Sequence, residues 1–170
     1  MEILILGILL VALMVFASTK IKKSAARAFD EEPVETSEFT LIKPQGFLRP
    51  LKDEESFEAY SKDFGAEGAS DLRLARARVV VTPDGDFEAI GREVNESGNS
   101  MQDAHFTVNG RRERTLEVER SEKGIPVNVF SKLIEGDGKV YRLETVVLRE
   151  QRDAFLRKIE MMMDSFSLRT

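Results

Sequence analysis

Hydrophobic and polar positions follow several distinct patterns along this 170-residue chain. Alternation of apolar and polar residues predicts β-strands, whereas apolar residues three or four positions apart predict helices. The expected strands cover residues 38–43, 72–82, 105–108, 112–120, 125–134 and 140–148. The expected helices cover residues 53–64 and 150–164, with a third, short helix whose start Asp86 or Asp84 can cap. Residues 3–17 stand apart as an unbroken apolar run.

The expected helices carry local start and stop signals. In the first, Asp53 can cap the start and Gly65 can end it, with Phe57, Tyr60 and Phe64 on one side. In the short helix, Phe87, Ile90 and Val94 share a side, and Gly98 follows its end. In the last, the apolar side comprises Phe155, Ile159, Met162, Met163 and Phe166, which leaves Met161 exposed.

The order of these elements predicts the fold class. A strand, a helix, a strand and a helix precede a run of closely spaced strands and a final helix. Asn109-Gly110 and Asp137-Gly138 predict tight hairpins in that run, because both residue pairs accept positive φ angles. We therefore expect an α+β domain in which helices flank an antiparallel sheet. Arg76, Arg78, Arg142 and Glu144 fall on the polar side of their strands and predict a sheet face in contact with water.

The apolar run at the N-terminus predicts a membrane anchor. As a helix, residues 3–19 would be about 26 Å long at about 1.5 Å per residue, close to the hydrocarbon thickness of a bilayer. A buried core helix would show a polar stripe, and this segment has none. The anchor residues are Ile3, Leu4, Ile5, Leu6, Ile8, Leu9, Leu10, Val11, Leu13, Met14, Val15 and Phe16.

The flanking charges bear on cleavage and orientation. A secretory signal begins with basic residues, but only Met1 and Glu2 precede this run, so we expect a retained, single-pass anchor. The basic residues follow it at Lys20, Lys22, Lys23 and Arg27, which favours a cytoplasmic domain. The alternative is an exported domain, on the periplasmic or extracellular side, for which the N-terminal segment serves as a leader.

Length, charge and cysteine content limit the domain organisation and the kinds of binding site that this chain can have. The expected organisation is an anchor at 1–19, a charged juxtamembrane linker at 20–37 and one domain at 38–170. A net charge of −5 argues against a nucleic-acid-binding protein. The chain has no cysteine, so disulfides, thiolate metal sites and lipid attachment through cysteine are excluded.

Four stretches together resemble the PsbP-like α/β/α sandwich superfamily. They are EFTLIKPQGF, FEAIGREVNESG, FTVNGRRERTLEVE, and VYRLETVV followed by FLRKIEMMMDSF. In order, they are similar to the family's opening strand, a helix, a hairpin, and the last strand with its helix. The resemblance covers about residues 38–168, with residues 48–70 departing from it. Photosystem II extrinsic proteins, a Ran-GTPase-binding import factor, DcrB-type proteins and Eag chaperones belong to this group.

The resemblance implies a non-enzymatic domain that binds another protein, without implying a shared site. We therefore expect a membrane-anchored binding module whose protein partner is unknown. The arginines beside the Asn109-Gly110 turn can dock an acidic partner, or can pair with Glu113, Glu117 and Glu119 across strands. The candidate partner surface comprises Arg76, Arg78, Arg111, Arg112, Arg114, Arg142 and Glu144.

Evidence for catalysis in the sequence is sparse. His105 is the only histidine, and a hydrolase or lyase would pair it with Asp103 or Glu117. No G-x-S-x-G stretch presents a serine, and no glycine-rich phosphate-binding motif occurs. One histidine without cysteine makes a transition-metal site unfavourable. We expect no enzyme activity, no cofactor and no metal.

Overall fold

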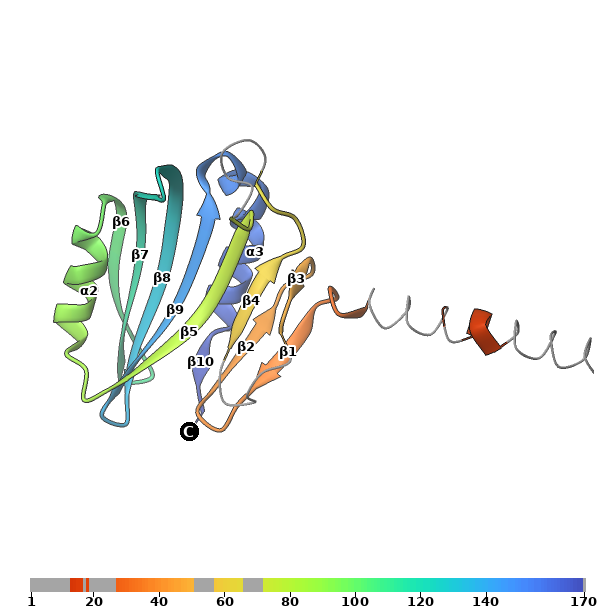
Figure 1. Cartoon of the computed structure of the whole chain (residues 1–170). Coiled ribbons are helices and arrows are strands. Elements are labelled where there is room, and N and C mark those ends of the chain that lie inside the picture. The colour runs from red at the N-terminus through yellow and green to blue at the C-terminus, as the bar shows by residue number, and fades with distance from the viewer. Residues whose placement is uncertain (1–12, 17, 19–26, 51–56, 66–71, 170) are drawn as a thin grey trace, which may run out of the picture.

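In the computed structural model, described residues 13–16, 18, 27–50, 57–65 and 72–169 include two antiparallel sheets and the helices α2 and α3 (Figure 1). The large sheet has seven strands in the order β3-β4-β5-β9-β8-β7-β6. Their bounds are β3 Phe47–Leu48, β4 Glu58–Ser61, β5 Ala75–Pro83, β6 Asn99–Val108, β7 Arg111–Glu122, β8 Ile125–Gly136 and β9 Lys139–Leu148. The α+β class is thus confirmed.

A small sheet joins the two ends of the domain. Its order is β1-β2-β10, with bounds β1 Glu32–Glu35, β2 Phe39–Lys43 and β10 Ser167–Leu168. The helices are α2 Phe87–Glu96 and α3 Arg152–Ser165, the latter preceded by the 3-10 helix η1 Arg149–Gln151. Because β2 pairs with both β1 and β10, residues more than 100 positions apart form one sheet.

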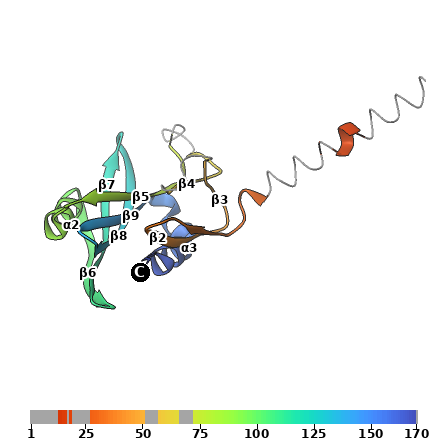
Figure 2. The same ribbon diagram turned by 90° about the horizontal axis from the view of Figure 1, so that it is seen from below.

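The main core lies between the two sheets. One face of the large sheet, here called the inner face, packs against α3 and the small sheet (Figure 2). This core includes Phe39, Phe47, Leu143, Ile159 and Phe166, all of them buried. The opposite face, here called the outer face, carries α2, which packs mainly on β6, β7 and β8. Two layers therefore cover the inner face, whereas α2 covers only part of the outer face.

The predicted faces and turns agree with the structure. Ala75 and Ala77 are buried on β5 while Arg76 and Arg78 are exposed, which is the predicted alternation. Asp86 caps α2 as expected, since its side chain accepts bonds from the amides of Glu88 and Ala89.

The hairpin turns rely on positive φ angles. Asn109 and Gly110 have φ angles of 53° and 78°, and Asp137 and Gly138 have 53° and 72°. A third hairpin turn at Lys123-Gly124, where φ is 50° and 80°, was not predicted from the sequence. Lysine is an unusual residue at a positive φ angle, so the dipeptide gives a weaker signal.

The helix predicted at residues 53–64 is wrong over its described part. Residues 53–56 lie outside the described residues, but Glu58–Ser61 form β4, which pairs with β5. Phe57, Ala59 and Ser61 are buried, so the true period is two rather than three or four. The spacing of Phe57, Tyr60 and Phe64 fits only the helical period, whereas pairing with β5 imposes a period of two and puts Phe57 and Tyr60 on opposite faces.

The expected linker at 20–37 is too long at its C-terminal end. Residues Glu32–Glu35 form β1, with Val34 buried opposite Leu41. Lys43 also binds the residues that precede β1, because its fully buried ammonium donates to the carbonyls of Ala28 and Asp30. The folded domain therefore begins near Arg27.

Most of the expected anchor at residues 3–19 lies outside the described residues. Leu13–Phe16 are described as helical, with side chains that are 63%, 62%, 60% and 69% exposed in chain order. Among the described helices, none has both the length and the apolar character needed to cross a membrane.

Candidate functional site

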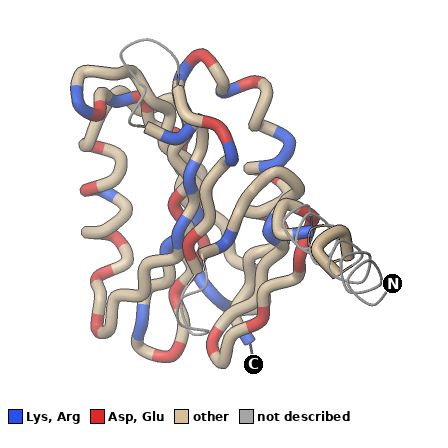
Figure 3. Tube along the Cα trace, turned by 45° about the vertical axis from the view of Figure 1, so that its right-hand side comes forward, with Lys and Arg blue, Asp and Glu red and all other residues tan. Residues whose placement is uncertain are grey.

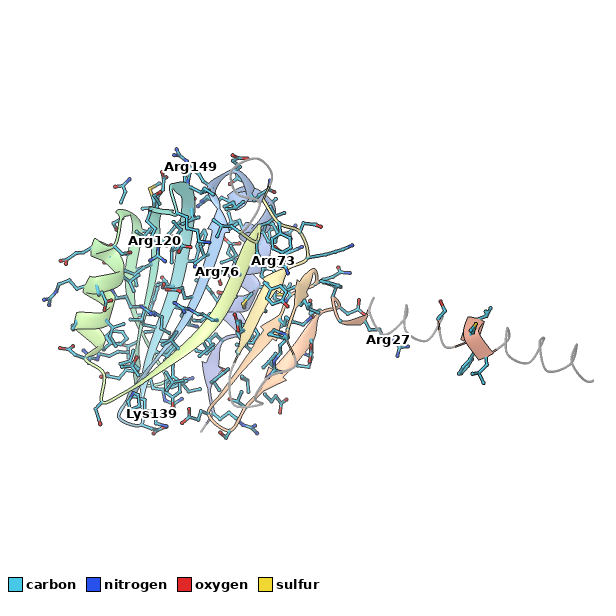
Figure 4. The ribbon with its side chains drawn as sticks, viewed as in Figure 1. Arg27, Arg73, Arg76, Arg120, Lys139 and Arg149 are labelled. Carbon is cyan, nitrogen blue, oxygen red and sulfur yellow. The ribbon has the colours of Figure 1, made fainter. Side chains whose placement is uncertain are left out.

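The open part of the outer face gathers arginines from β5, β9 and β7, with β8 lying between the last two strands. We call Arg76, Arg78, Arg120, Glu122, Arg142 and Glu144 the arginine face. The register brings them together, since Arg78 on β5 lies opposite Glu144 on β9. Figure 3 shows basic and acidic positions interleaved along these strands, and Figure 4 shows Arg76 and Arg120 on the same side of the sheet.

Two carboxylates organise this surface, each between two guanidinium groups. Glu144 accepts from Arg78, whose Nε and Nη2 lie 3.0 Å and 2.8 Å from Oε1, and its Oε2 lies 4.0 Å from Arg142. Glu122 accepts from Arg76 and from Arg120, both at 2.7 Å. The carboxylates hold the arginines in place and keep the guanidinium groups from repelling one another.

Burial differs sharply between the two kinds of side chain. Arg76 and Arg78 are 52% and 56% exposed, whereas Glu144 is 5% exposed and Glu122 is 19% exposed. The four arginines also outnumber Glu122, Glu144 and the exposed Glu58, which lies opposite Arg78 in the strand register, so this face has an excess of positive charge. An approaching molecule therefore meets cationic groups first, although the whole chain carries a net charge of −5.

An apolar floor lies beside the arginines. Val127, Val146 and Leu148 form a small buried cluster with Val129, and Leu72 packs against it. A small hollow is lined by Leu72, Val127, Val146 and Leu148 together with Arg73, Arg76 and Glu122. Since the Arg76–Glu122 pair lies at its rim, the hollow combines apolar contact with charge.

The interior of this face has unused hydrogen-bonding capacity. Within the described part of the chain, the buried atoms Ser131 Oγ and Arg142 Nε have no hydrogen-bond partner. Ser131 lies opposite Glu144 in the strand register, so both atoms belong to the centre of the outer face. Buried polar atoms normally have a hydrogen-bond partner. These two atoms therefore favour contact of this face with water or with a polar group of another molecule.

Beyond these residues, the guanidinium group of Arg73 lies against two aromatic rings. Its guanidinium carbon lies 4.5 Å from the Tyr60 ring centre and 3.7 Å from the Phe64 ring centre. Sequence reasoning missed Arg73, Arg120 and Glu122. The period-2 pattern of β7 offered a signal for Arg120 and Glu122, since both fall on the arginine side of the sheet.

The three arginines beside the Asn109-Gly110 turn do not act as one cluster. Arg111 belongs to the inner face and donates to the Leu168 carbonyl. Arg112 makes a two-point contact with Glu135, and its guanidinium lies over the Phe87 ring. These contacts separate Arg111 from Arg112.

Arg114 is largely buried. Its Nε and Nη2 donate to the two oxygens of Asp103 at 2.8 Å and 2.6 Å. The guanidinium beside Asp103 lowers the pKa of that carboxyl below its usual value. Arg114 is 8% exposed at its side chain, so it supports α2 rather than meeting a partner.

The predicted pairing of Arg112 and Arg114 with Glu113, Glu117 and Glu119 is wrong. Alternate residues of β7 face opposite ways, so these glutamates lie on the inner face. There Glu117 accepts from Arg152 at 2.6 Å and 2.9 Å, and from Asn128 at 3.1 Å. This contact raises the pKa of the Arg152 guanidinium.

Of the two acidic partners expected for a catalytic His105, the structure places Asp103 beside it and Glu117 on the opposite face of the sheet. His105 is 53% exposed, and its Nε2 lies 3.6 Å from Asp103 Oδ1 on the outer face. Glu117, the other candidate, lies on the inner face and is held by Arg152. Among the described residues, no three His, Asp or Glu side chains converge as a metal ion would require.

Comparison with known proteins shows the fold. No family model matches the chain, and no curated protein matches it. The chain is similar in structure to LpqN of Mycobacterium tuberculosis, described as involved in cell envelope biogenesis, at 14% identity and a TM-score of 0.57. That match covers 83% of this chain and 91% of LpqN.

Two further solved structures agree. The cyanobacterial PsbP protein CyanoP from Synechocystis matches at 12% identity and a TM-score of 0.55, over 83% of this chain and 94% of CyanoP. PA94 of Pseudomonas aeruginosa, of unknown function, matches at 12% identity and 0.56, over 82% of this chain and 98% of PA94. The predicted PsbP-like fold is therefore confirmed, and at these identities the likeness concerns the fold alone.

Proposed function

We propose that this chain is a membrane-anchored, non-catalytic module of the cell envelope. Its domain binds an acidic segment of a partner protein through the arginine face. The observation that carries this proposal is the burial difference between cations and anions. Arg76 and Arg78 are more than half exposed above carboxylates that are largely buried.

The energetics favour contact with an anion at this face. Exposed ion pairs contribute about 0–1 kcal/mol each, so exchanging part of the Arg76–Glu122 contact for a partner carboxylate costs little. Guanidinium groups bind carboxylates through two parallel hydrogen bonds, which gives directionality as well as charge. Val127 and Val146 are buried beneath this face, so the contact relies on charge and on the direction of the hydrogen bonds rather than on apolar area.

The N-terminal segment supports the anchoring part of the proposal. Leu13–Phe16 are exposed apolar residues in helical conformation, and both views show this turn away from the sheets (Figures 1 and 2). They belong to the apolar run of residues 3–17. A helix that is apolar on all sides matches the interior of a bilayer.

The absence of enzyme activity is also a proposal, and the ion pairs support it. The acidic partners available to His105 are committed elsewhere, Asp103 to Arg114 and Glu117 to Arg152. A general base in catalysis needs a carboxylate or imidazole free to take a proton, with a pKa near the working pH. Here the pKa of Asp103 is lowered instead.

Residues 20–27 favour a cytoplasmic orientation of the domain, because Lys20, Lys22, Lys23 and Arg27 follow the apolar run. The second candidate places the same module outside the cytoplasm. The described role of LpqN in cell envelope biogenesis favours that alternative. Both candidates share the anchored binding module and differ in the compartment of the partner.

The binding face is tested by photo-crosslinking in living cells. A benzophenone amino acid in place of Tyr60 lies beside Arg76 in the strand register. We expect a discrete adduct with an acidic segment of one protein, lost when Arg76→Glu and Arg78→Glu are combined. The matched control combines Arg92→Glu and Arg157→Glu on the exposed sides of α2 and α3, and should keep the adduct. An adduct that survives the first pair, or fails with both, contradicts the proposed face.

The anchor is tested by membrane fractionation, intact mass and protease treatment of whole cells. Retention in carbonate-washed membranes with residues 3–19 present supports the anchor. Protection in sealed cells, followed by digestion after lysis, supports the cytoplasmic orientation. Digestion from outside favours the exported candidate, and a new N-terminus near Ser18 identifies a cleaved leader.

A further inference from the structure

Strand β6 is a long, open edge of the large sheet. It spans Asn99–Val108, ten residues that are all exposed except Ala104, which is half-buried. The strand order ends at β6, so no described strand pairs with its outer side (Figure 1). An open edge offers a row of backbone donors and acceptors to another strand.

The hairpin turn fixes which backbone groups point outward. The positive φ angles of Asn109 and Gly110 are those of a type I′ turn, in which Val108 and Arg111 close the ladder as a hydrogen-bonded pair. Hydrogen-bonded and non-hydrogen-bonded pairs then alternate along the strand. The N–H and C=O groups of Asp103, His105 and Thr107 therefore point away from β7.

The other described edge strands are either very short or carry residues that discourage pairing. The opposite edge of the large sheet is β3, which has only two residues. In the small sheet, β1 carries Pro33 and two glutamates, features that discourage further pairing. Strand β6 contains neither proline nor lysine. It is thus the long described edge without these protections.

Exposed apolar side chains accompany this open backbone. Met101, Phe106 and Val108 are 57%, 50% and 44% exposed. Phe106 and Val108 lie on the same face of the sheet as Ala104, by the alternation of the strand. Pairing at this edge would cover apolar area as well as satisfy hydrogen bonds.

We propose that β6 pairs with β6 of a second copy of this chain, antiparallel and centred on Ala104. In this register Asp103 lies opposite the partner copy's His105, and His105 opposite the partner copy's Asp103. Each strand supplies one acid and one base on the same face, at the spacing that the two-fold axis requires. Gln102 then lies opposite Phe106 on the other face.

Charge favours this register over the two adjacent registers, which are shifted by one residue. Centring on Asp103 places two carboxylates opposite each other, and centring on His105 places two imidazoles opposite each other. Like groups directly opposed across strands are destabilising, whereas an acid opposite a base is favourable. The arrangement around Ala104 is thus the self-complementary one.

The helices leave room for this dimer. In each copy α2 packs chiefly on β7, the second strand from the edge. With strands about 4.8 Å apart, each β7 would lie about 7 Å from the two-fold axis, so the two α2 helices would be about 14 Å apart. Packed helices approach to about 8–10 Å, so the two copies of α2 would not collide.

A single introduced cysteine tests the register, because the chain has no cysteine of its own. Ala104 would form a non-hydrogen-bonded pair with its counterpart, at about 4.5 Å between Cα atoms. That separation lies within the range for a disulfide. We expect mild oxidation of full-length Ala104→Cys, in native membranes and in detergent, to give a covalent dimer.

Gln102→Cys is the matched control on the same strand and face. Its counterpart would be displaced by four residues, about 13 Å, too far for a disulfide. We expect no covalent dimer from this variant. Equal crosslinking at both positions, or none at residue 104, overturns the proposal.

Substitution of His105 by proline distinguishes a dimer held by backbone pairing from one held by side-chain contact alone. In the Ala104→Cys background, His105→Pro removes an outward N–H and leaves the bonds to β7 intact, so the covalent dimer should be lost. His105→Gln keeps that N–H and should retain the dimer. If the two variants behave alike while thermal unfolding is unchanged, the proposal fails. The outcome is independent of the arginine face, whose residues are unaltered.

Discussion

Arg114 illustrates how one side chain sets the residue types around it. Its guanidinium is bound at two points by Asp103 and lies against Gly91 of α2. A Cβ atom at residue 91 would come within 2.8 Å of the Arg114 Cζ atom. The glycine in the middle of α2 is therefore required by its neighbour, although glycine costs about 1 kcal/mol relative to alanine in a helix.

Gly91→Ala should accordingly destabilise the domain despite its better helix propensity. Displacing the buried guanidinium strains the Asp103 pair, and overpacking of this kind costs about 1–3 kcal/mol. Urea unfolding at neutral pH measures the change. In an Arg114→Met background the same substitution should be neutral or stabilising. Equal losses in both backgrounds would contradict the steric explanation.

Asp103 gives a prediction for acid stability. Its pKa is lowered in the folded chain, first by the hydrogen bond from Arg114. The carboxylate therefore stabilises the fold above the unfolded-state pKa of about 3.9, and this stabilisation is lost as the pH falls through the folded-state pKa. The difference in unfolding free energy between wild type and Asp103→Asn should be largest at neutral pH and shrink below about pH 4.

Unfolding in urea across a pH series measures that difference. When Arg114→Met is already present, adding Asp103→Asn should no longer change the acid dependence. A wild-type-to-variant difference that stays constant down to strongly acidic pH would contradict the assigned cause.

At the scale of elements, Lys43 connects the start of the domain to β2. Its Nζ donates to the carbonyls of Ala28, Asp30 and Phe47 at 3.0, 2.6 and 2.9 Å, and lies 3.7 Å from Glu32. Burial lowers the pKa of this ammonium, with Glu32 acting in the opposite direction. The residues that follow the proposed anchor are thereby attached to the sheet.

Lys43→Met should loosen these residues selectively. The substitution keeps most of the side-chain volume but leaves three carbonyls without their donor, at a cost on the order of 1–3 kcal/mol. Hydrogen exchange should accelerate at the Gly46 amide, which donates to Phe29, and in β1. Lys62→Met, at an exposed position, is the control. Unchanged protection at Gly46 would contradict this role.

The elements that could be predicted from sequence are those with strong local signals. The hairpins at Asn109-Gly110 and Asp137-Gly138, the α2 cap at Asp86 and the final helix all follow from neighbouring residues. Strand β4 could not be predicted, because its period appears only once β5 is beside it. Strand β1 has one buried apolar residue, Val34, and gives almost no pattern.

Part of the candidate site could be predicted from the alternation of residues along its strands, whereas Arg73, Arg120 and Glu122 were missed. Alternation along β5 and β9 placed Arg76, Arg78, Arg142 and Glu144 on one face, and the structure places them there. Alternation cannot reveal which side chains a helix covers. The burial of Arg114 beneath α2 therefore required the tertiary structure.

For the whole molecule, the core joins parts of the chain that are distant in sequence. One buried cluster contains Phe39 from the small sheet, Leu143 from the large sheet and Ile159 from α3. Phe166 packs edge-on against Phe39, with ring centres 5.8 Å apart, just before β10. No layer can lose its packing without exposing apolar surface of another, so the domain should unfold in one cooperative transition.

Phe39→Ala and Leu143→Ala test that cooperativity. Each removes a buried side chain at a cost of about 2–5 kcal/mol, and each should lower the unfolding midpoint seen by every probe together. Near-ultraviolet signal, far-ultraviolet signal and protease resistance should coincide in both variants. Met161→Ala, at an exposed position of α3, should change stability by less than about 0.5 kcal/mol. If Phe39→Ala releases the small sheet while the large sheet keeps its midpoint, the two sheets are independent units. The arginine face would then be supported by the large sheet alone.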